Sequence, residues 1–338
     1  MSRVPAKPFL LMLLCLLPLV MIFSLVNGTV AIPFMEILSA ITNTDNQNSV
    51  ILWQIRLPRI LLALSVGIIL ATSGAVMQGL FRNPLADPSL IGVSSGASVG
   101  AGLVIVIAAQ FLPAGINTSM PLIAAGAFAG GFTATVLVYR LATSEVGTSV
   151  ATMLLAGIAI SALAGALNSL LSYFADNDML RRISLWQMGN LSGSNWQGLW
   201  LVALSATLLV IFFPRDSSAL NALLLGESEA RHLGIEVQKV KQRLVLLTAF
   251  GVGVSVAAAG LIAFVGLVVP HIVRLLIGPD HRFLIPGSAL LGGMLLMLAD
   301  SISRVVIAPV ELPTGIITAL LGAPFFILLL IQQRKRVT

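Results

Sequence analysis

Long apolar stretches recur along the whole chain, each separated from the next by a short polar segment. Nine of them approach the roughly 20 residues that a helix needs to cross a bilayer. Backbone groups find no partner in lipid, so such stretches close their hydrogen bonds as helices, and the alternation of β-barrel strands is absent. The predicted spans are residues 9–26, 57–80, 89–111, 121–139, 146–175, 198–213, 244–269, 283–299 and 312–331. The apolar character resumes at 270–277, which predicts a short tenth helix.

Arginine and lysine decide between nine spans and ten, because short cytoplasmic loops carry an excess of both residues. With ten spans and a cytoplasmic N-terminus, only Arg56, Arg59, Arg181, Arg182 and Arg304 lie outside, which leaves 14 of the 19 basic residues inside. Nine spans would move the basic C-terminal tail to the outside. We therefore predict ten spans, with both termini in the cytoplasm.

Composition agrees with a membrane protein. Of the 338 residues, 57% are hydrophobic and 9% are charged, whereas a soluble domain carries about 25% charged residues. The net charge of +6 follows from the topology, and the basic residues form no continuous stripe that would suit nucleic acid. A single cysteine, Cys15, excludes a disulfide framework and a cysteine-based metal site. The first apolar stretch is longer than a signal-peptide core and no A-x-A site follows it, so we expect the first helix to be retained.

Groups that would couple transport to an ion gradient are nearly missing from the span interiors. Carriers driven by protons or sodium keep acidic, basic or histidine side chains there. Here Asp300 and Glu311 fall at span ends, and His271 follows Pro270 near a break. The chain also lacks the G-x-x-x-x-G-K-[ST] phosphate loop of many nucleotide-binding proteins. The remaining classes are a passive channel and a transporter driven by a partner.

The longest polar segment predicted to face the cytoplasm, residues 214–243, offers a surface to such a partner. Its pattern predicts two short amphipathic helices that suit a groove on another protein. A helix resting on lipid headgroups is the alternative, but it would be rich in Lys and Arg, and acids match or outnumber bases over 226–236. The expected apolar stripe comprises Leu223, Leu224, Leu225, Ala230 and Leu233, with Glu227, Glu229 and Arg231 facing elsewhere.

Several long motifs, in this order, resemble the FecCD family, the membrane subunits of type II ABC importers for iron-siderophores, haem and cobalamin. The resemblance extends from about residue 50 to the end of the chain. The motifs are 56–59 (RLPR), 73–88 (SGAVMQGLFRNPLADP), 91–96 (IGVSSG), 226–234 (GESEARHLG), 264–274 (FVGLVVPHIVR), 280–282 (DHR), 299–304 (ADSISR) and 311–324 (ELPTGIITALLGAP).

The resemblance implies an all-α integral membrane protein, a ten-helix bundle of the cobalamin/siderophore importer permease type, with residues 1–338 as a single permease domain. It implies a homodimer in the bacterial inner membrane, with two copies of a cytoplasmic ABC ATPase below and a periplasmic substrate-binding protein above. ATP and Mg would bind the ATPase; this subunit would be no enzyme and would hold no cofactor, metal ion or catalytic residue. The coupling residues would be Leu225, Gly226, Glu227, Ala230, Arg231, Leu233 and Gly234.

The resemblance also gives a role to three outside arginines. Arg56, Arg59 and Arg304 match family positions that receive acidic residues of the binding protein. A guanidinium grips a carboxylate with two parallel hydrogen bonds and never loses its charge. Snorkelling at a span start is the alternative for Arg56 and Arg59, and an i,i+4 pair with Asp300 is the alternative for Arg304.

Two other patterns suggest a hydrolase site and a structural or ligand-binding cluster. Residues 92–96 fit the G-x-S-x-G pattern of serine hydrolases, with Ser94 or Ser95 as nucleophile and His271 as base, but that motif requires a preceding strand. The polar cluster from His271 to Arg282 predicts a cytosolic ion-pair network that fixes a helix end, with a metal or haem ligand role for His271 as the alternative. An ATP-independent carrier is the remaining rival to the importer.

The cargo is not specified by any residue in the chain. The stretch 185–196 (LWQMGNLSGSNW) is most similar to haem importers within the family. Siderophore and cobalamin permeases carry similar sequence there, so haem is the first expectation and a ferric siderophore the next.

Overall fold

The computed structural model describes residues 4–28, 47–108, 120–145 and 147–337. The regular elements in these residues are helices, joined by short connecting segments, and one antiparallel hairpin of β1 (Thr143–Ser144) with β2 (Gly147–Thr148). Arg3 and residues 109–111, where the third predicted span ends, lie outside the described residues. The helices are α1 (Ala6–Val26), α3 (Gln47–Val50), α4 (Leu57–Leu80), α5 (Val93–Leu103), α7 (Met120–Leu141), α8 (Val150–Phe174), α9 (Asn177–Gln187), α10 (Trp196–Phe212), α11 (Ser217–Leu223), α12 (Glu227–His232), α13 (Val237–Ala259), α14 (Val265–Ile277), α15 (His281–Val305) and α16 (Thr314–Val337).

Seven helices of the described residues are long and apolar enough to cross a membrane. Three shorter apolar helices accompany them: Val93–Ile107, Val265–Ile277 and Thr314–Leu329. An all-helical membrane protein is therefore confirmed. The prediction of a continuous span at 244–269 is wrong, because α13 ends at Ala259 and α14 begins at Val265. Gly260 and Phe264 have φ angles of 68°, and left-handed residues cannot continue a right-handed helix.

The core of the bundle is built around α4, which is buried on all sides. It packs against α10, α13, α14 and α15. Small residues let helix backbones approach closely in a membrane, and two glycine contacts on α4 show this directly. A side chain on Gly74 would overlap the Gly266 carbonyl of α14, and one on Gly67 would overlap the Gly292 carbonyl of α15.

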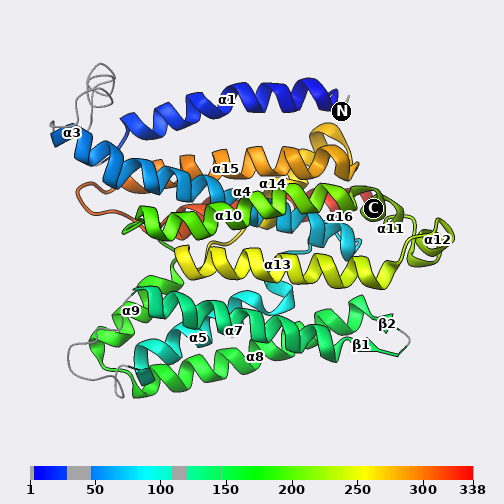
Figure 1. Ribbon diagram of the computed structural model, residues 1–338, viewed down its shortest axis with the longest axis horizontal. Helices are drawn as coiled ribbons and strands as arrows, with labels where there is room; N and C mark the ends of the chain where they lie inside the picture. Colours follow the sequence, from blue (N-terminus) through cyan, green and yellow to red (C-terminus); the bar gives the residue numbers. More distant parts are fainter. Residues whose placement is uncertain (1–3, 29–46, 109–119, 146, 338) are drawn as a thin grey trace.

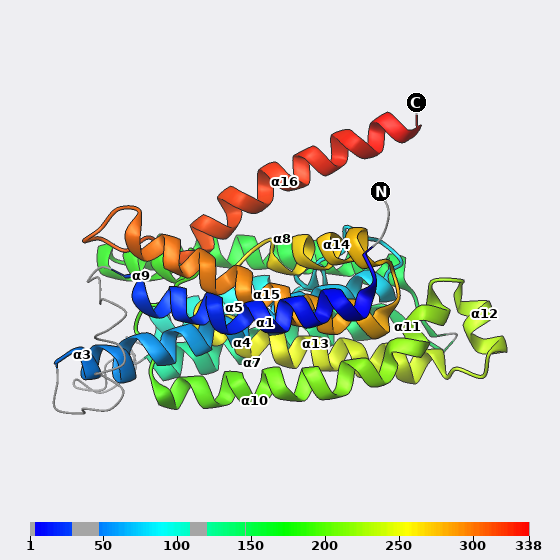
Figure 2. The ribbon, with the colours of Figure 1, turned by 90° about the horizontal axis from the view of Figure 1, so that it is seen from above.

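The two ends of the bundle differ in structure (Figure 1). At one end, on the right of the view, lie α11, α12 and the hairpin. At the other end lie α3 and α9. Turned by 90°, the bundle shows α16 leaving the other helices along its length (Figure 2). Large apolar side chains of the described part of α16 are exposed, among them Leu320, Leu321, Ile327 and Leu328.

Two helices begin halfway through the bundle. The N-terminus of α5 lies beside the middle of α7, where a side chain on Gly131 would lie 2.8 Å from the Val93 carbonyl oxygen. The N-terminus of α14 lies beside Gly74, within α4. From this depth α5 runs toward the end with α9, and α14 runs toward the end with α11 (Figure 1). Discontinuous helices of this kind are typical of transporters.

Candidate functional site

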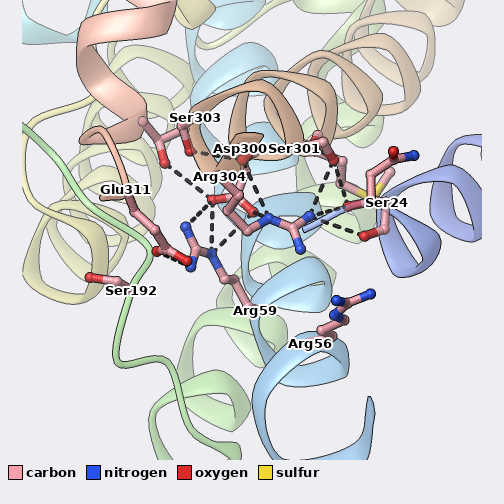
Figure 3. A network of polar contacts seen from close by, with 12 residues as sticks. Ser24, Arg56, Arg59, Ser192, Asp300, Ser301, Ser303, Arg304 and Glu311 are labelled. Atoms are coloured by element: carbon pink, nitrogen blue, oxygen red, sulfur yellow. Dashed lines mark hydrogen bonds and ion pairs between the residues drawn. The ribbon is translucent and has the colours of Figure 1, made fainter. Parts of the chain in front are cut away.

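The three arginines predicted to dock a binding protein lie together at the end of the bundle that carries α3 (Figures 1 and 3). Arg56 ends a π-helical segment (Ile51–Arg56), Arg59 lies in the first turn of α4, and Arg304 lies in the last turn of α15. All three side chains are buried. Three arginines this close to one another require compensating carboxylates and carbonyl oxygens.

Asp300 supplies most of that compensation. Its carboxylate is fully buried and lies between two guanidinium groups (Figure 3). Arg59 Nε donates to both Asp300 oxygens, at 2.9 and 3.1 Å. Arg304 Nε lies 3.2 Å from Asp300 Oδ2, which is the i,i+4 pair expected as the alternative. Thr314, the first residue of α16, donates its hydroxyl to the same carboxylate at 3.2 Å.

Further contacts tie this network to the remaining elements. Glu311, in the segment before α16, accepts from Arg59 Nη1 at 2.6 Å. Arg304 Nη2 donates to the Ser24 hydroxyl near the end of α1 at 2.9 Å. Arg56 Nη1 donates to the carbonyls of Leu25 and Val26. The network thus joins α1, α4, α15 and α16 at one end of the bundle.

These contacts define what a docking protein would meet. The Arg59 and Arg304 side chains are almost fully enclosed, whereas Glu311 is 28% exposed. A foreign carboxylate could therefore approach Arg59 through the place that Glu311 occupies. The arginines lie at a single end of the bundle, as docking requires, and their docking role stays a prediction.

The opposite end carries the predicted coupling residues, on α11, α12 and the turns beside them. The two predicted short helices are present, but the single apolar stripe is wrong. Leu223 and Ala230 are buried against the bundle, whereas Leu225 and Leu233 are 71% and 65% exposed. Gly226 separates the two helices with φ of 132°, a conformation that favours glycine, and this turn rotates the face of α12 relative to that of α11.

The charged coupling residues also divide between surface and interior. Arg231 is exposed and lies 3.9 Å from Glu227, in a weak i,i+4 pair. Glu227 is only partly exposed, because it turns toward Lys241 of α13. Gly234 ends α12 with φ of 81°. The exposed side of the segment therefore includes Leu224, Leu225, Arg231 and Leu233, and Glu227 turns inward to Lys241.

The cluster from His271 to Arg282 is held together differently from the prediction. No ion pair joins its members among the described residues. Asn221 of α11 instead donates to Asp280 Oδ1 at 2.7 Å and lies 2.8 Å from His281 Nδ1. Partial burial alone would raise the pKa of Asp280, but hydrogen bonds from Arg282 N–H and Asn221 lower this pKa below its usual value. These hydrogen bonds stabilise the fold at a pH above the ordinary Asp pKa. That stabilisation is lost as the pH falls through the lowered pKa of Asp280.

A cavity of about 330 Å³ lies where α5 and α14 begin. Asp87, Ser89 and Ser94 line it together with 261–264 and Leu267. Asp87 lies at mid-depth, since a side chain on Gly266 would lie 3.0 Å from the Leu70 carbonyl oxygen of α4 and 3.3 Å from Asp87 Oδ2. The chain thus re-enters the bundle after α4. Hydropathy did not distinguish Asp87 as a buried acidic group, although Pro84, Pro88 and Gly92 indicate an interrupted helix there.

Ser95 is not arranged as a hydrolase nucleophile. Its hydroxyl lies 3.0 Å from the Ser161 hydroxyl of α8 and donates to the Gly92 carbonyl. The preceding segment, Pro88–Ile91, is a 3-10 helix, whereas the nucleophile elbow requires a strand. The G-x-S-x-G match is therefore part of helix packing.

Comparison with known proteins gives one consistent family. Residues 15–332 match the FecCD transport family. The hemin transport system permease protein HmuU of Yersinia pestis is 44% identical over 338 residues, which cover 99% of this chain and 98% of that protein. The vitamin B12 import system permease protein BtuC of Salmonella typhi is 46% identical over 285 residues, 84% of each chain.

Solved structures agree with this result. An inward-facing metal-chelate type ABC transporter superposes with a TM-score of 0.84 at 33% identity, over 96% of this chain and 99% of that chain. PsaBC of Streptococcus pneumoniae superposes with a TM-score of 0.52 at 18% identity, over 80% of this chain and 88% of that chain, which shows a shared fold alone.

Proposed function

Because the chain belongs to the FecCD transport family, we propose that its cargo is haem. The chain is the permease subunit of a bacterial ABC importer and is not itself the ATPase. The observation that carries the haem proposal is the similarity to a hemin permease over nearly the full length of both chains. The similarity to vitamin B12 permeases covers less of the chain. Cobalamin, or a ferric siderophore, is the second candidate.

The proposed architecture is a ten-span subunit that pairs with a copy of itself. Seven long and three short apolar helices among the described residues support the ten spans. We place the pairing on α8 and α16, because both helices have uncovered apolar side chains and both pack against segments beside the mid-depth cavity. Those of α8 include Leu155, Ile158, Leu163 and Leu170. The end with α11 and α12 then faces the cytoplasm, together with both termini.

The proposed partners bind at the two ends of the helix bundle. Two ATPase copies bind at α11 and α12, where exposed Leu225 and Leu233 suit an apolar groove. ATP and Mg are held by those ATPases, and this subunit contributes no cofactor. A periplasmic binding protein docks at the arginine end, with its acidic side chains directed to Arg56, Arg59 and Arg304.

The mid-depth cavity is proposed as part of the path of the cargo. The segments that line it pack against the proposed dimer face. Gly157 of α8 lies on the carbonyl of Leu90, next to the lining residue Ser89, and Gly322 of α16 lies on the lining residue Phe264. Water must reach such a path in at least one state of the transport cycle.

We expect Ser94→Cys, in a Cys15→Ser background, to react with a water-soluble thiol reagent in membrane vesicles. Ser94 lines the cavity, whereas Ser73 of α4 is fully buried, so Ser73→Cys is the matched control and should stay unmodified. The measurement is the labelled fraction by mass spectrometry, with and without cargo-loaded binding protein. Equal labelling of the two positions would contradict a water-filled path at Ser94.

The cargo assignment is tested by reconstitution. The permease is placed in liposomes with a cognate ATPase and binding protein, and uptake of haem, cobalamin and a ferric siderophore is compared at equal concentration. We expect ATP-dependent uptake of haem in preference to the others. Uptake without the ATPase would contradict the assignment of an ATP-driven importer. Selective uptake of another chelate would contradict only the haem assignment and leave the importer in place.

A further inference from the structure

Lys241 is a fully buried lysine in the second turn of α13. Lysine is almost never fully buried unless it is paired. Its neighbour Lys239 shows the ordinary arrangement, with an exposed side chain bound to Glu236, the N-cap residue of α13. The burial of Lys241 is therefore specific to its position and not a property of this end of α13.

The Lys241 ammonium group joins two elements that are far apart in the sequence. Its Nζ donates to Glu227 Oε1 at 2.6 Å, and Glu227 is the first residue of α12. The same Nζ donates to the Thr148 carbonyl oxygen at 2.7 Å. Thr148 ends the hairpin that leads into α8. One buried cation thus bridges the coupling helix to the start of α8.

A second contact fixes the hairpin on α13. Gln238 Oε1 accepts from the Thr148 N–H at 3.0 Å, so α13 holds both backbone groups of this residue. Gly147 packs so closely on the Gln238 amide that a side chain would overlap it. The next residue, Ser149, caps α8 by accepting from the Thr152 N–H at 3.3 Å. Contacts therefore run without interruption from α12 to the first turn of α8.

The physical consequence is that α12 and the start of α8 cannot separate easily. Displacing Glu227 from Lys241 would leave a buried cation with an uncompensated charge, which is strongly unfavourable. A force that moves α12 is thus transmitted to the hairpin and not dissipated at this junction. Further along, Gly157 of α8 packs on the carbonyl of Leu90, which directly follows the cavity-lining residue Ser89.

We propose that Lys241 is the positioning residue that transmits movement of α12, through Glu227 and Thr148, to α8. This inference rests on the proposed function, because it assigns α12 to the ATPase and α8 to the dimer face. Lys241 touches neither ATP nor cargo, and it acts only through the two elements that it joins.

The test compares Lys241→Met with Lys239→Met in the reconstituted importer. Methionine keeps much of the apolar stem of lysine and removes the charge, and Lys239 is the matched exposed control. Three quantities are measured: ATPase retained on the purified permease, ATP hydrolysis, and cargo imported per ATP. For Lys241→Met we expect the ATPase to stay bound and hydrolysis to continue, while import per ATP falls about tenfold, within the usual range of coupling between sites. Lys239→Met should behave as the unmodified protein.

Glu227→Gln provides the second arm, since it alters the less buried partner and keeps the shape of the side chain. If Lys241→Met fails to fold, the reduced import per ATP must appear in Glu227→Gln. If both fold, the double variant should lose no more coupling than the single ones, because the two residues act as one unit. Unchanged import per ATP, or loss of bound ATPase, would overturn the inference. Failure of the unmodified complex to import would instead overturn the proposed function.

Discussion

Asp300→Ala is expected to lower the free energy of unfolding by about 3–5 kcal/mol, the usual cost of removing one partner from a buried ion pair. The carboxylate is fully buried and balances Arg59 of α4 and Arg304 of its own helix. Without it, two guanidinium groups would face each other in a place that water hardly reaches, and Thr314 would lose its acceptor. The measurement is urea or thermal unfolding of the purified permease in detergent.

Glu311→Gln is the control for this prediction. Glu311 also binds Arg59 but is partly exposed, and ion pairs near solvent contribute only about 0–1 kcal/mol. We therefore expect a much smaller loss of stability from this variant. If Asp300→Ala were as stable as Glu311→Gln, the arginines would have to be neutralised by groups other than Asp300.

Hydropathy predicts the spans because the transfer free energies of successive residues into lipid add up along the chain. Hydropathy does not predict where a helix is interrupted. Residues 260–264 are as apolar as their surroundings, but Gly260 and Phe264 both have φ of 68°; Gly260 ends α13 and Phe264 precedes the start of α14. Such angles are stabilised by tertiary contacts, here the packing of Phe264 on Gly322 of α16, which a local pattern does not contain.

In the candidate sites, too, the sequence predicts local features and not long-range contacts. Motifs located the arginines and the coupling segment, and the i,i+4 spacing of Asp300 and Arg304 was visible in the sequence. The pairing of Arg59 with Asp300 joins residues 241 positions apart, so no periodicity could reveal it. The apolar stripe failed at Gly226, since a residue at φ of 132° changes the direction of the chain and a helical period is not continuous across it.

Leu225→Ser combined with Leu233→Ser is expected to abolish stable binding of the ATPase while the permease stays folded. Both side chains are largely exposed, so their loss leaves no cavity in the bundle. Full burial of a leucine contributes about 1.5–3 kcal/mol. Two of them at one contact therefore account for about 3 kcal/mol or more, which is at least about 100-fold in affinity. The measurement is the dissociation constant of the ATPase for the permease in nanodiscs.

Glu236→Gln serves as the matched control, because it changes an exposed residue just beyond the same segment and leaves both leucines in place. Its ATPase affinity should equal that of the unmodified protein. The alternative, in which α12 rests on lipid headgroups, predicts the opposite pattern. The leucine variant would then bind the ATPase normally and would show a changed depth of α12 in the membrane, measurable by quenching of a probe on that helix. Because the polar side of α12 carries acidic Glu229 beside Arg231, an anionic lipid surface gains little attraction there, and a protein groove is the occupant that these leucines favour.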